Sequence, residues 1–477
     1  MFEDKHFPPI SLCQAQTASS AESKAASAQT TDVTVQCLSL SEAGVQTESA
    51  RLRDASSGET GAGQAASGVD WKRLAAFMAS RESELSRLLC RSEAAFRRFE
   101  SGLSSDAAIS ITHSLRHSDL PDQAQGLCLD WNSVGTTVAV GCGQSVHEDW
   151  CTHSGYLVTW NLERRQLDPG KADHFLDFQS CLTALRFHPG RPGLLAVGCY
   201  NGDVAVVDLA LEEGKLVAAE SRAEDGGHKD PVSDLQWLST QGEEMRLMSS
   251  AYDGNLFIWL LPSGKKQLQL SKAFHITAAS LPRSLRGKVT QTGKAAGVTS
   301  LCLSRAWGEV FLAGGETGGV FHCSTEAREP VSVPGLALPA HNPVLFPLTP
   351  HLGPVYSLSP SPFQPELVLS TSADGRVCIY HRNKLDPLVA IEVGEGGLYG
   401  AAWSPNRPAV FAVATQNGHI AVFDFTFSEV KPIKKEEVGK DGATVFKVAF
   451  NPTAGQILAT VDAHAVIKCK VCEDKWG

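Results

Sequence analysis

A turn-and-strand unit that recurs down the chain constrains its fold more than any other feature. In the clearest copy, Asp253-Gly254 is followed by Asn255-Leu256-Phe257-Ile258-Trp259, and the aromatic residue lies six positions after the Asp. An Asp, Asn or Ser followed by Gly suits a tight turn between two strands, because these residues tolerate the required backbone bend. Related units, some of them degraded, end at residues 160, 207, 259, 323, 380, 423 and 469. These units predict a closed ring of small sheets rather than a catalytic α/β domain.

The spacing of the units indicates how large each sheet is. Successive units end 47, 52, 64, 57, 43 and 46 residues apart, which is near the period of about 40–45 residues, plus insertions, expected for four-stranded propeller blades. Several units open with a similar strand that stops at a proline, as in residues 182–189 and 445–452, and a proline cannot donate to a sheet ladder. The sequence therefore predicts an all-β fold, with a seven-bladed β-propeller over residues 107–477.

The same units resemble the WD40 repeat family. In that family a His before the first strand, a Ser or Thr in the second strand, the turn Asp and a later Trp form a buried hydrogen-bonded chain. The resemblance implies these roles for two sets of residues, namely His228, Ser249 or Ser250, Asp253 and Trp259 in the third unit, and His351, Ser370 or Ser372, Asp374 and Tyr380 in the fifth. The other units lack at least one member, so apolar packing is expected to hold them.

Composition excludes several classes of function. The chain carries a formal net charge of −10 and lacks the basic footprint that nucleic-acid partners usually require, so no nucleic-acid partner is expected. No apolar run approaches the roughly 20 residues that span a bilayer, so no membrane span is predicted. The start of the chain, Met1-Phe2-Glu3-Asp4-Lys5, has no signal-peptide core. The 13 Cys residues then indicate reduced thiols in a cytosolic setting.

Candidate metal ligands and catalytic groups are few. His147, Asp149 and His153 fall in one loop of the first unit; such residues bind metals, but a solvated loop is the interpretation we favour. Cys469 and Cys472 form a CxxC pair, yet no second pair lies at zinc-finger spacing, and the two side chains of a strand at this spacing point to opposite faces. No nucleophile–base arrangement stands out. The sequence predicts no catalytic residue, no metal and no cofactor.

Residues 1–68 differ in kind from the repeats. They are rich in Ala, Ser, Thr, Gln and Gly, so they cannot bury enough apolar surface to offset the entropy of ordering and are predicted to be a disordered tail. Gln-Thr pairs recur in this tail, and an extended segment can add as a strand to the edge of a partner's sheet. The alternative is that a tract rich in Gln and Thr contains such pairs by chance. The residues concerned are Gln16, Thr17, Gln29, Thr30, Val45, Gln46, Thr47 and Glu48.

Residues 69–103 are predicted to form one amphipathic helix. Asp70 is placed to cap its start and Gly102 to end it. The helix packs either on the ring or against another protein, and the long disordered stretch before it favours another protein. Its apolar stripe at helical spacing includes Leu74, Phe77, Met78, Leu85 and Leu88.

Two further segments carry predictions. Residues 107–113 alternate like a strand, and we expect this strand to close the ring by pairing with the last unit. Residues 263–296, between the third and fourth units, form a basic insertion without Asp or Glu. The insertion is either a contact for an acidic partner or a solvated flexible loop. Its candidate contact residues include Lys265, Lys266, Arg283 and Arg286.

The order of these parts resembles the dynein intermediate chains, and among them those of the cytoplasmic dynein 2 motor. A tail with Gln-Thr pieces precedes one helix, and a ring of seven units follows. The matching residues are Val45-Gln46-Thr47-Glu48, Arg73-Leu74-Ala75-Ala76-Phe77, Ala124-Gln125-Gly126-Leu127, Leu281-Pro282-Arg283-Ser284 and Gly353-Pro354-Val355-Tyr356-Ser357. Because propeller rings serve many functions, the helix and insertion matches make the resemblance specific.

The resemblance implies assembly rather than chemistry. It implies that the propeller binds the dynein 2 heavy chain, that the helix binds a roadblock-type light chain, and that the tail binds eight-kilodalton light chains. Those light-chain dimers would join this chain to the other dynein 2 intermediate chain. The implied setting is the cytoplasm and the cilium, including the axoneme and basal body, in retrograde intraflagellar transport and cilium assembly. The alternative is a cytosolic WD40 scaffold, or a ubiquitin-ligase adaptor that holds substrates on the top face of the ring.

Overall fold

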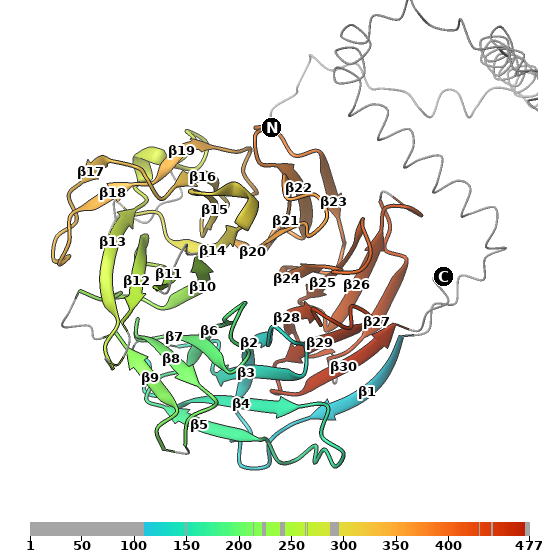
Figure 1. Cartoon of the computed structure of the whole chain (residues 1–477). Coiled ribbons are helices and arrows are strands. Elements are labelled where there is room, and N and C mark those ends of the chain that lie inside the picture. Colours follow the sequence, from blue (N-terminus) through green and yellow to red (C-terminus); the bar gives the residue numbers. More distant parts are fainter. Residues whose placement is uncertain are drawn as a thin grey trace, which may run out of the picture. The chain divides into compact units, whose positions relative to one another are not determined.

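Seven sheets surround a central opening in the part of the chain that the structure describes (Figure 1). The structure is a computed structural model, and it describes residues 109–472 apart from 148–149, 213, 222–225, 239–243, 263, 265, 287–294, 429 and 440–441. The predicted all-β, seven-bladed propeller is confirmed. The only helices in the described part are short 3-10 turns, including η2 (Ala278–Ser280) and η4 (Arg305–Trp307), and none of them is long and apolar enough to cross a membrane.

Each blade has four antiparallel strands that follow one another from the central opening outward, in chain order except for the last strand of blade 7. Blades 1 to 3 contain β2 (Gln125–Trp131), β3 (Thr137–Gly143), β4 (Gly155–Asn161) and β5 (His174–Phe178); β6 (Leu182–Phe187), β7 (Leu194–Cys199), β8 (Val204–Asp208) and β9 (Val217–Glu220); and β10 (Val232–Leu238), β11 (Met245–Ala251), β12 (Asn255–Leu261) and β13 (Gln269–His275).

Blades 4 to 7 follow the same order, with two departures described below. They contain β14 (Val298–Leu303), β15 (Val310–Gly315), β16 (Val320–Ser324) and β19 (Val344–Pro347); β20 (Val355–Pro360), β21 (Leu367–Ser372), β22 (Arg376–His381) and β23 (Val389–Glu392); β24 (Leu398–Trp403), β25 (Val410–Thr415), β26 (His419–Asp424) and β27 (Lys434–Glu437); and β28 (Val445–Phe450), β29 (Ile457–Asp462), β30 (Ile467–Cys472) and β1 (Ile109–Leu115).

The turn glycines explain why the repeat is visible in the sequence. Gly254 has φ of 76° and Gly318 has φ of 96°, a region of backbone conformation that other residues rarely adopt. A Cβ atom on Gly318 would also lie 2.4 Å from the carbonyl oxygen of His351 in the next blade. The first unit is an exception, because Gly155 is the first residue of β4 and residues 144–154 form a long loop between β3 and β4. The repeat predicts a tight turn at Ser154-Gly155 in the unit that ends at residue 160, and that prediction is therefore wrong.

The ring is closed by the strand that the sequence predicted. Strand β1 pairs antiparallel with β30, with Ser110 opposite Val471 and Leu115 opposite Ile467. The Thr112 hydroxyl also donates to the carbonyl of Cys469 over 2.9 Å, and the Leu115 side chain is fully buried. The first and last described strands thus complete blade 7 together, as Figure 1 shows where the blue β1 lies beside the red β30.

The basic insertion of residues 263–296 is partly a regular element of the ring. It contains β13, the fourth strand of blade 3, whose Phe274 side chain is buried in the core with Leu281 and Leu285. A second excursion follows β16, where β17 (Glu329–Val331) and β18 (Ala340–Asn342) form a hairpin. Strand β18 pairs in parallel with β13, so blade 3 has six strands. A segment that leaves blade 4 therefore covers the outer edge of blade 3.

Tryptophan side chains connect neighbouring blades near the central opening. Trp131 at the end of β2 donates its indole N–H to the carbonyl of Ala449 in blade 7 over 3.2 Å. Trp237 in blade 3 donates to the carbonyl of Arg186 in blade 2 over 3.0 Å. Trp403 makes the equivalent bond from blade 6 to blade 5. Each indole is largely buried, and its N–H group has a hydrogen-bond acceptor. These bonds therefore hold neighbouring blades together without leaving a buried polar group unpaired.

Candidate functional site

The third blade brings together the four buried residues of the network that the WD40 resemblance implied. His228 Nε2 lies 2.7 Å from the Ser249 hydroxyl, and the Trp259 indole N–H donates to that hydroxyl over 2.8 Å. The other ring nitrogen of His228 lies 3.5 Å from an Asp253 carboxylate oxygen. Asp253 also accepts the backbone N–H of Asn255 over 2.9 Å. The network links the loop before the blade to its second strand, its turn and its third strand.

The fifth blade departs from this pattern at its aromatic residue. His351 Nε2 lies 2.7 Å from the Ser370 hydroxyl, within hydrogen-bond distance, and His351 Nδ1 lies 3.1 Å from the Asp374 carboxylate. The Tyr380 hydroxyl, in contrast, donates to the carbonyl of Thr349 over 2.8 Å. Tyr380 therefore occupies the position of the Trp but makes no hydrogen bond to Ser370. The network of blade 5 thus contains the His, the Ser and the Asp, without the aromatic residue.

Both networks hold ionised carboxylates. Although burial opposes ionisation, hydrogen bonding to the His228 ring lowers the pKa of Asp253 to about 2. In the same way the pKa of Asp374 falls to about 2 because, against the effect of burial, it bonds the His351 ring. Burial opposes protonation of His351, but its bond to Asp374 raises its pKa to about 9. Interaction with the histidine ring thus outweighs desolvation of the carboxylate in both blades.

The Ser, His and Asp types of these networks are those of a nucleophilic triad, but they are placed for structure. A nucleophile needs access to its substrate, whereas Ser249 and Ser370 are 0% exposed and the two histidines at most 3%. The networks join strands within a blade. The six residues His228, Asp253, Trp259, His351, Asp374 and Tyr380 therefore contribute stability.

A group of charged side chains that was not predicted from the sequence lines the central opening. A cavity of about 420 Å³ is bordered by the innermost strands. There the guanidinium of Arg186 lies 3.9 Å from Asp130 and 3.5 Å from Asp234. Asp130 also accepts the backbone N–H of Phe187 over 2.8 Å, and Asp234 accepts that of Leu301 over 2.9 Å. These contacts tie blades 1 to 4 together around the opening.

Burial perturbs these charges further. It raises the pKa of Asp130, against the attraction of Arg186, and it lowers the pKa of Lys447, which faces the same cavity from blade 7. The signal that could have identified the group is a charge between apolar residues of an innermost strand, as in Leu129-Asp130-Trp131 and Leu185-Arg186-Phe187. In the sequence, a charged residue at such a position resembles one that faces solvent. It faces the cavity only because the closed ring brings the innermost strands together.

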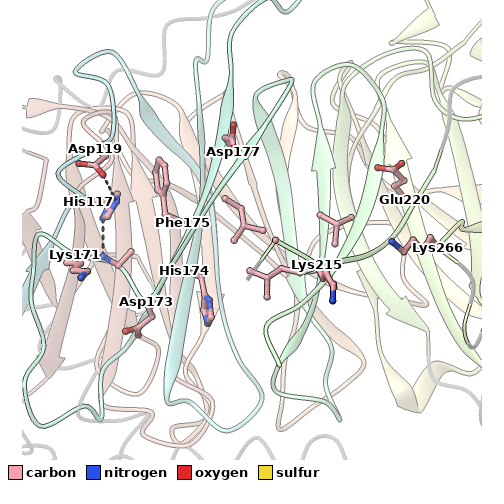
Figure 2. Close-up of a pocket in the computed structure, with 15 residues that line it drawn as sticks. His117, Asp119, Lys171, Asp173, His174, Phe175, Asp177, Lys215, Glu220 and Lys266 are labelled. Atoms are coloured by element: carbon pink, nitrogen blue, oxygen red, sulfur yellow. Dashed lines mark hydrogen bonds and ion pairs between the residues drawn. The ribbon is translucent and has the colours of Figure 1, made fainter. Parts of the chain in front are cut away.

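An open groove follows the outer edges of blades 1 and 2 (Figure 2). It has a volume of about 720 Å³ and extends from His117 to Lys266. His117 accepts the backbone N–H of Ala172 over 3.0 Å and lies 3.7 Å from Asp119, which anchors one end. Both cationic and anionic side chains line it. They are Lys171, Lys215 and Lys266, and Asp119, Asp173, Asp177 and Glu220.

The basic segment contributes to this groove through one of its four candidate contacts. Lys266 is exposed, and its carbonyl accepts the backbone N–H of Glu220 over 3.0 Å, which joins the segment to the edge of blade 2. Arg286 turns its guanidinium to the carbonyls of Leu281 and Ala279. Arg283 is exposed. Neither Arg283 nor Arg286 lines the groove, and Lys265 lies outside the described residues.

The light-chain sites predicted from the sequence lie outside the described residues. This holds for the tail and for the predicted helix of residues 69–103, and the candidate metal ligand Asp149 also lies outside the described residues. The predicted contacts concerned are Gln16, Thr17, Gln29, Thr30, Val45, Gln46, Thr47 and Glu48 in the tail, and Leu74, Phe77, Met78, Leu85 and Leu88 in the helix.

Comparison with known proteins agrees with the observed blades. The family model described as "WD domain, G-beta repeat" matches residues 342–381, which span most of blade 5. A human protein named "cytoplasmic dynein 2 intermediate chain 2" (Homo sapiens) is 35% identical over 416 residues, which cover 85% of this chain and 77% of that protein. The Mus musculus protein of the same name is 35% identical over 354 residues, or 72% of this chain and 65% of its own length.

More distant relatives share a smaller part of the chain. A human protein named "dynein axonemal intermediate chain 2" (Homo sapiens) is 28% identical over 294 residues, which cover 61% of this chain and 44% of that protein. Such an alignment is shorter than the ring, whereas 85% of 477 residues is about 405, more than the 369 residues from Ile109 to Gly477. The similarity to the human cytoplasmic protein therefore extends into the residues before the ring.

Proposed function

The chain is a member of the dynein intermediate chain family, and we propose that it joins the heavy chain to the light chains of the cytoplasmic dynein 2 motor without catalysing a reaction. Members of this family are associated with the cytoskeleton and the cilium. In this proposal the chain acts in retrograde intraflagellar transport and cilium assembly, in the cytoplasm, the axoneme and the basal body. The observation that carries the proposal is the similarity that continues past the ring into the first 108 residues.

The division of labour in the proposal follows from the physical character of each part. The ring is a rigid platform, because its charged, aromatic and strand contacts join every blade to the next, and it would hold the heavy chain. The helix stripe around Leu74 and Phe77 would hold a roadblock-type light chain. The Gln-Thr pieces, with Gln46-Thr47 as the best copy, would add as strands to eight-kilodalton light chains.

The light chains would contribute mainly by raising effective concentration. A dimeric light chain has two identical sites, so it can join the tail of this chain to the tail of the other dynein 2 intermediate chain. Once one tail is bound, the second binds in an intramolecular step, and weak individual contacts add up to a stable assembly. ATP hydrolysis in this proposal belongs to the heavy chain.

Co-purification with the full-length chain tests the proposal. We expect both light chains to be retained by the wild type. Gln46→Ala with Thr47→Ala removes the best tail piece and should weaken only the eight-kilodalton partner. Leu74→Asp with Phe77→Asp places charges in the apolar stripe and should remove only the roadblock-type partner.

Matched substitutions keep the test specific. Gln64→Ala changes a tail glutamine that no Thr follows, and it should leave eight-kilodalton binding unchanged. Ser83→Asp adds a charge on the side of the predicted helix opposite the stripe, and it should leave roadblock-type binding unchanged. Retention of neither light chain by the wild type would refute the proposal and favour the substrate-adaptor alternative.

A further inference from the structure

The loop between β3 and β4 brings three potential metal ligands to a fourth from the next blade. His147, Cys151 and His153 lie in this loop, and Cys181 lies directly before β6. One ligand atom of each residue, a ring nitrogen or a sulfur, lies within 4.8 Å of all the others. We propose that these four side chains form a structural zinc site that fastens blade 1 to blade 2.

The ligand set and the distances both suit zinc. Two thiolates and two imidazoles are a common tetrahedral set for structural zinc, with Zn–S of about 2.3 Å and Zn–N of about 2.0–2.1 Å. A tetrahedron of that size keeps its ligand atoms roughly 3.3–3.8 Å apart. The four atoms observed within 4.8 Å therefore need to close by about 1 Å or slightly more. Soft sulfur and nitrogen ligands disfavour magnesium and calcium.

The two histidines have ring nitrogens for which the described residues offer no other partner. His147 Nδ1 and Nε2 and His153 Nδ1 are buried and have no hydrogen-bond partner among those residues. Buried polar atoms in folded proteins are normally satisfied by protein, water or an ion. The ring of His147 is also stacked on Tyr200 of blade 2 at 3.8 Å, which fixes its orientation.

The two sulfurs receive backbone hydrogen bonds of the kind that support thiolates. The backbone N–H of Gln144 donates to Cys181 Sγ over 3.2 Å, and the backbone N–H of Cys181 donates to Cys151 Sγ over 3.4 Å. Such bonds orient metal ligands and stabilise their negative charge.

The loop approaches Cys181 closely and has little packing of its own. Gly143 precedes the loop and Gly155 follows it, and a Cβ on Gly143 would lie 2.5 Å from Cys181 Cβ. The large apolar residues of the loop point to solvent, since Val146 is 77% and Trp150 is 79% exposed. A loop without an apolar core needs another source of order, and a metal ion is one that small protein segments use.

Zinc analysis of the full-length chain, purified in a reducing buffer without chelator, tests the proposal. We expect about one zinc per chain to survive dialysis. Replacement of zinc by Co²⁺ should give the visible absorption of a tetrahedral cobalt site and a sulfur-to-cobalt charge-transfer band. Cys151→Ser and His153→Ala should each abolish retention of the metal. His464→Ala changes an exposed histidine of blade 7 and should leave retention unchanged.

A conservative variant separates ligation from folding. Cys151→His keeps a zinc ligand, so it should retain zinc and give a weaker charge-transfer band, because one sulfur is left. Near-ultraviolet circular dichroism confirms that each variant is folded. Absence of a tetrahedral cobalt spectrum in the folded wild type would overturn the proposal, as would full retention of zinc by Cys151→Ser. A disulfide between Cys151 and Cys181 that persists in the reducing buffer and excludes zinc would overturn it as well.

Discussion

Removal of the Ser249 hydroxyl is expected to destabilise the ring more than the matched serine change in blade 5. The hydroxyl is fully buried and contacts both His228 Nε2 and the Trp259 indole N–H, at 2.7 and 2.8 Å. Ser249→Ala leaves both nitrogens without a partner in the interior. A buried polar group that loses its partner costs about 1–3 kcal/mol, so the free energy of unfolding should fall by about 2–6 kcal/mol.

Ser370 provides the matched comparison in blade 5. It is equally buried and lies 2.7 Å from His351 Nε2, but the Tyr380 hydroxyl bonds Thr349 instead. Ser370→Ala therefore leaves only one side-chain group without its partner, and the expected cost is about 1–3 kcal/mol. The Ser370 hydroxyl also donates a long bond of 3.4 Å to the carbonyl of Cys378, so the excess cost of Ser249→Ala is a lower bound on what the Trp259 bond contributes.

Urea unfolding of the full-length chain, followed by tryptophan fluorescence, gives the comparison. The midpoint should shift most for Ser249→Ala, less for Ser370→Ala, and hardly at all for Ser271→Ala, an exposed serine on β13 whose loss should stay within about 0.5 kcal/mol. If Ser249→Ala costs no more than Ser370→Ala, the assignment of the extra stability to the serine–tryptophan bond is wrong.

Three other changes follow from the structure. Gly318→Ala places a Cβ 2.4 Å from a backbone carbonyl oxygen at a φ of 96°, so it should lower the free energy of unfolding by about 2 kcal/mol or more. In Gly170→Ala the nearest atom to the new Cβ lies at 3.5 Å, so the loss measured by thermal unfolding should stay within about 0.5 kcal/mol. The pKa of Asp253 is depressed to about 2, so its stabilisation of about 2 kcal/mol is complete above pH of about 4 and is lost as the pH falls through about 2. Asp253→Asn should flatten that part of the stability profile, and an unchanged slope would contradict the assignment. Leu115→Ala removes a fully buried side chain of the closing strand and should lower the free energy of unfolding by about 2–5 kcal/mol. Ile111→Ala, at a site 49% exposed, should lower it by about 0.5 kcal/mol or less. Equal urea midpoints for the two variants would refute this account of ring closure.

The parts of the fold that could be predicted depend on local chemistry. A turn such as Asp253-Gly254 needs a residue that adopts positive φ, and that requirement leaves a mark at a fixed distance from the next apolar strand. The closing strand was visible because Ile109 and Ile111 alternate. The buried network of blade 3 could be predicted residue by residue, because its four members lie at family positions.

What could not be predicted depends on contacts between distant segments. Cys181 reaches the loop of His147 only because the start of blade 2 lies beside that loop. Arg186 reaches Asp130 and Asp234 only in the closed ring. The hairpin of β17 and β18 has three-residue strands, too short to give a periodic pattern. Tyr380 chooses a backbone carbonyl over the serine, which the residue type alone does not reveal.

The clasp between β1 and β30 has a consequence for biosynthesis. Ribosomes make Ile109–Leu115 early, yet the partner of this strand, Ile467–Cys472, is made more than three hundred residues later. Until then the nascent polypeptide has an unpaired edge on an incomplete circle, and the Leu115 side chain has no complete core to enter. Pairing of such long sequence separation is slow and leaves intermediates exposed to aggregation. We therefore expect the nascent protein to benefit from chaperones until its last strand has been synthesised.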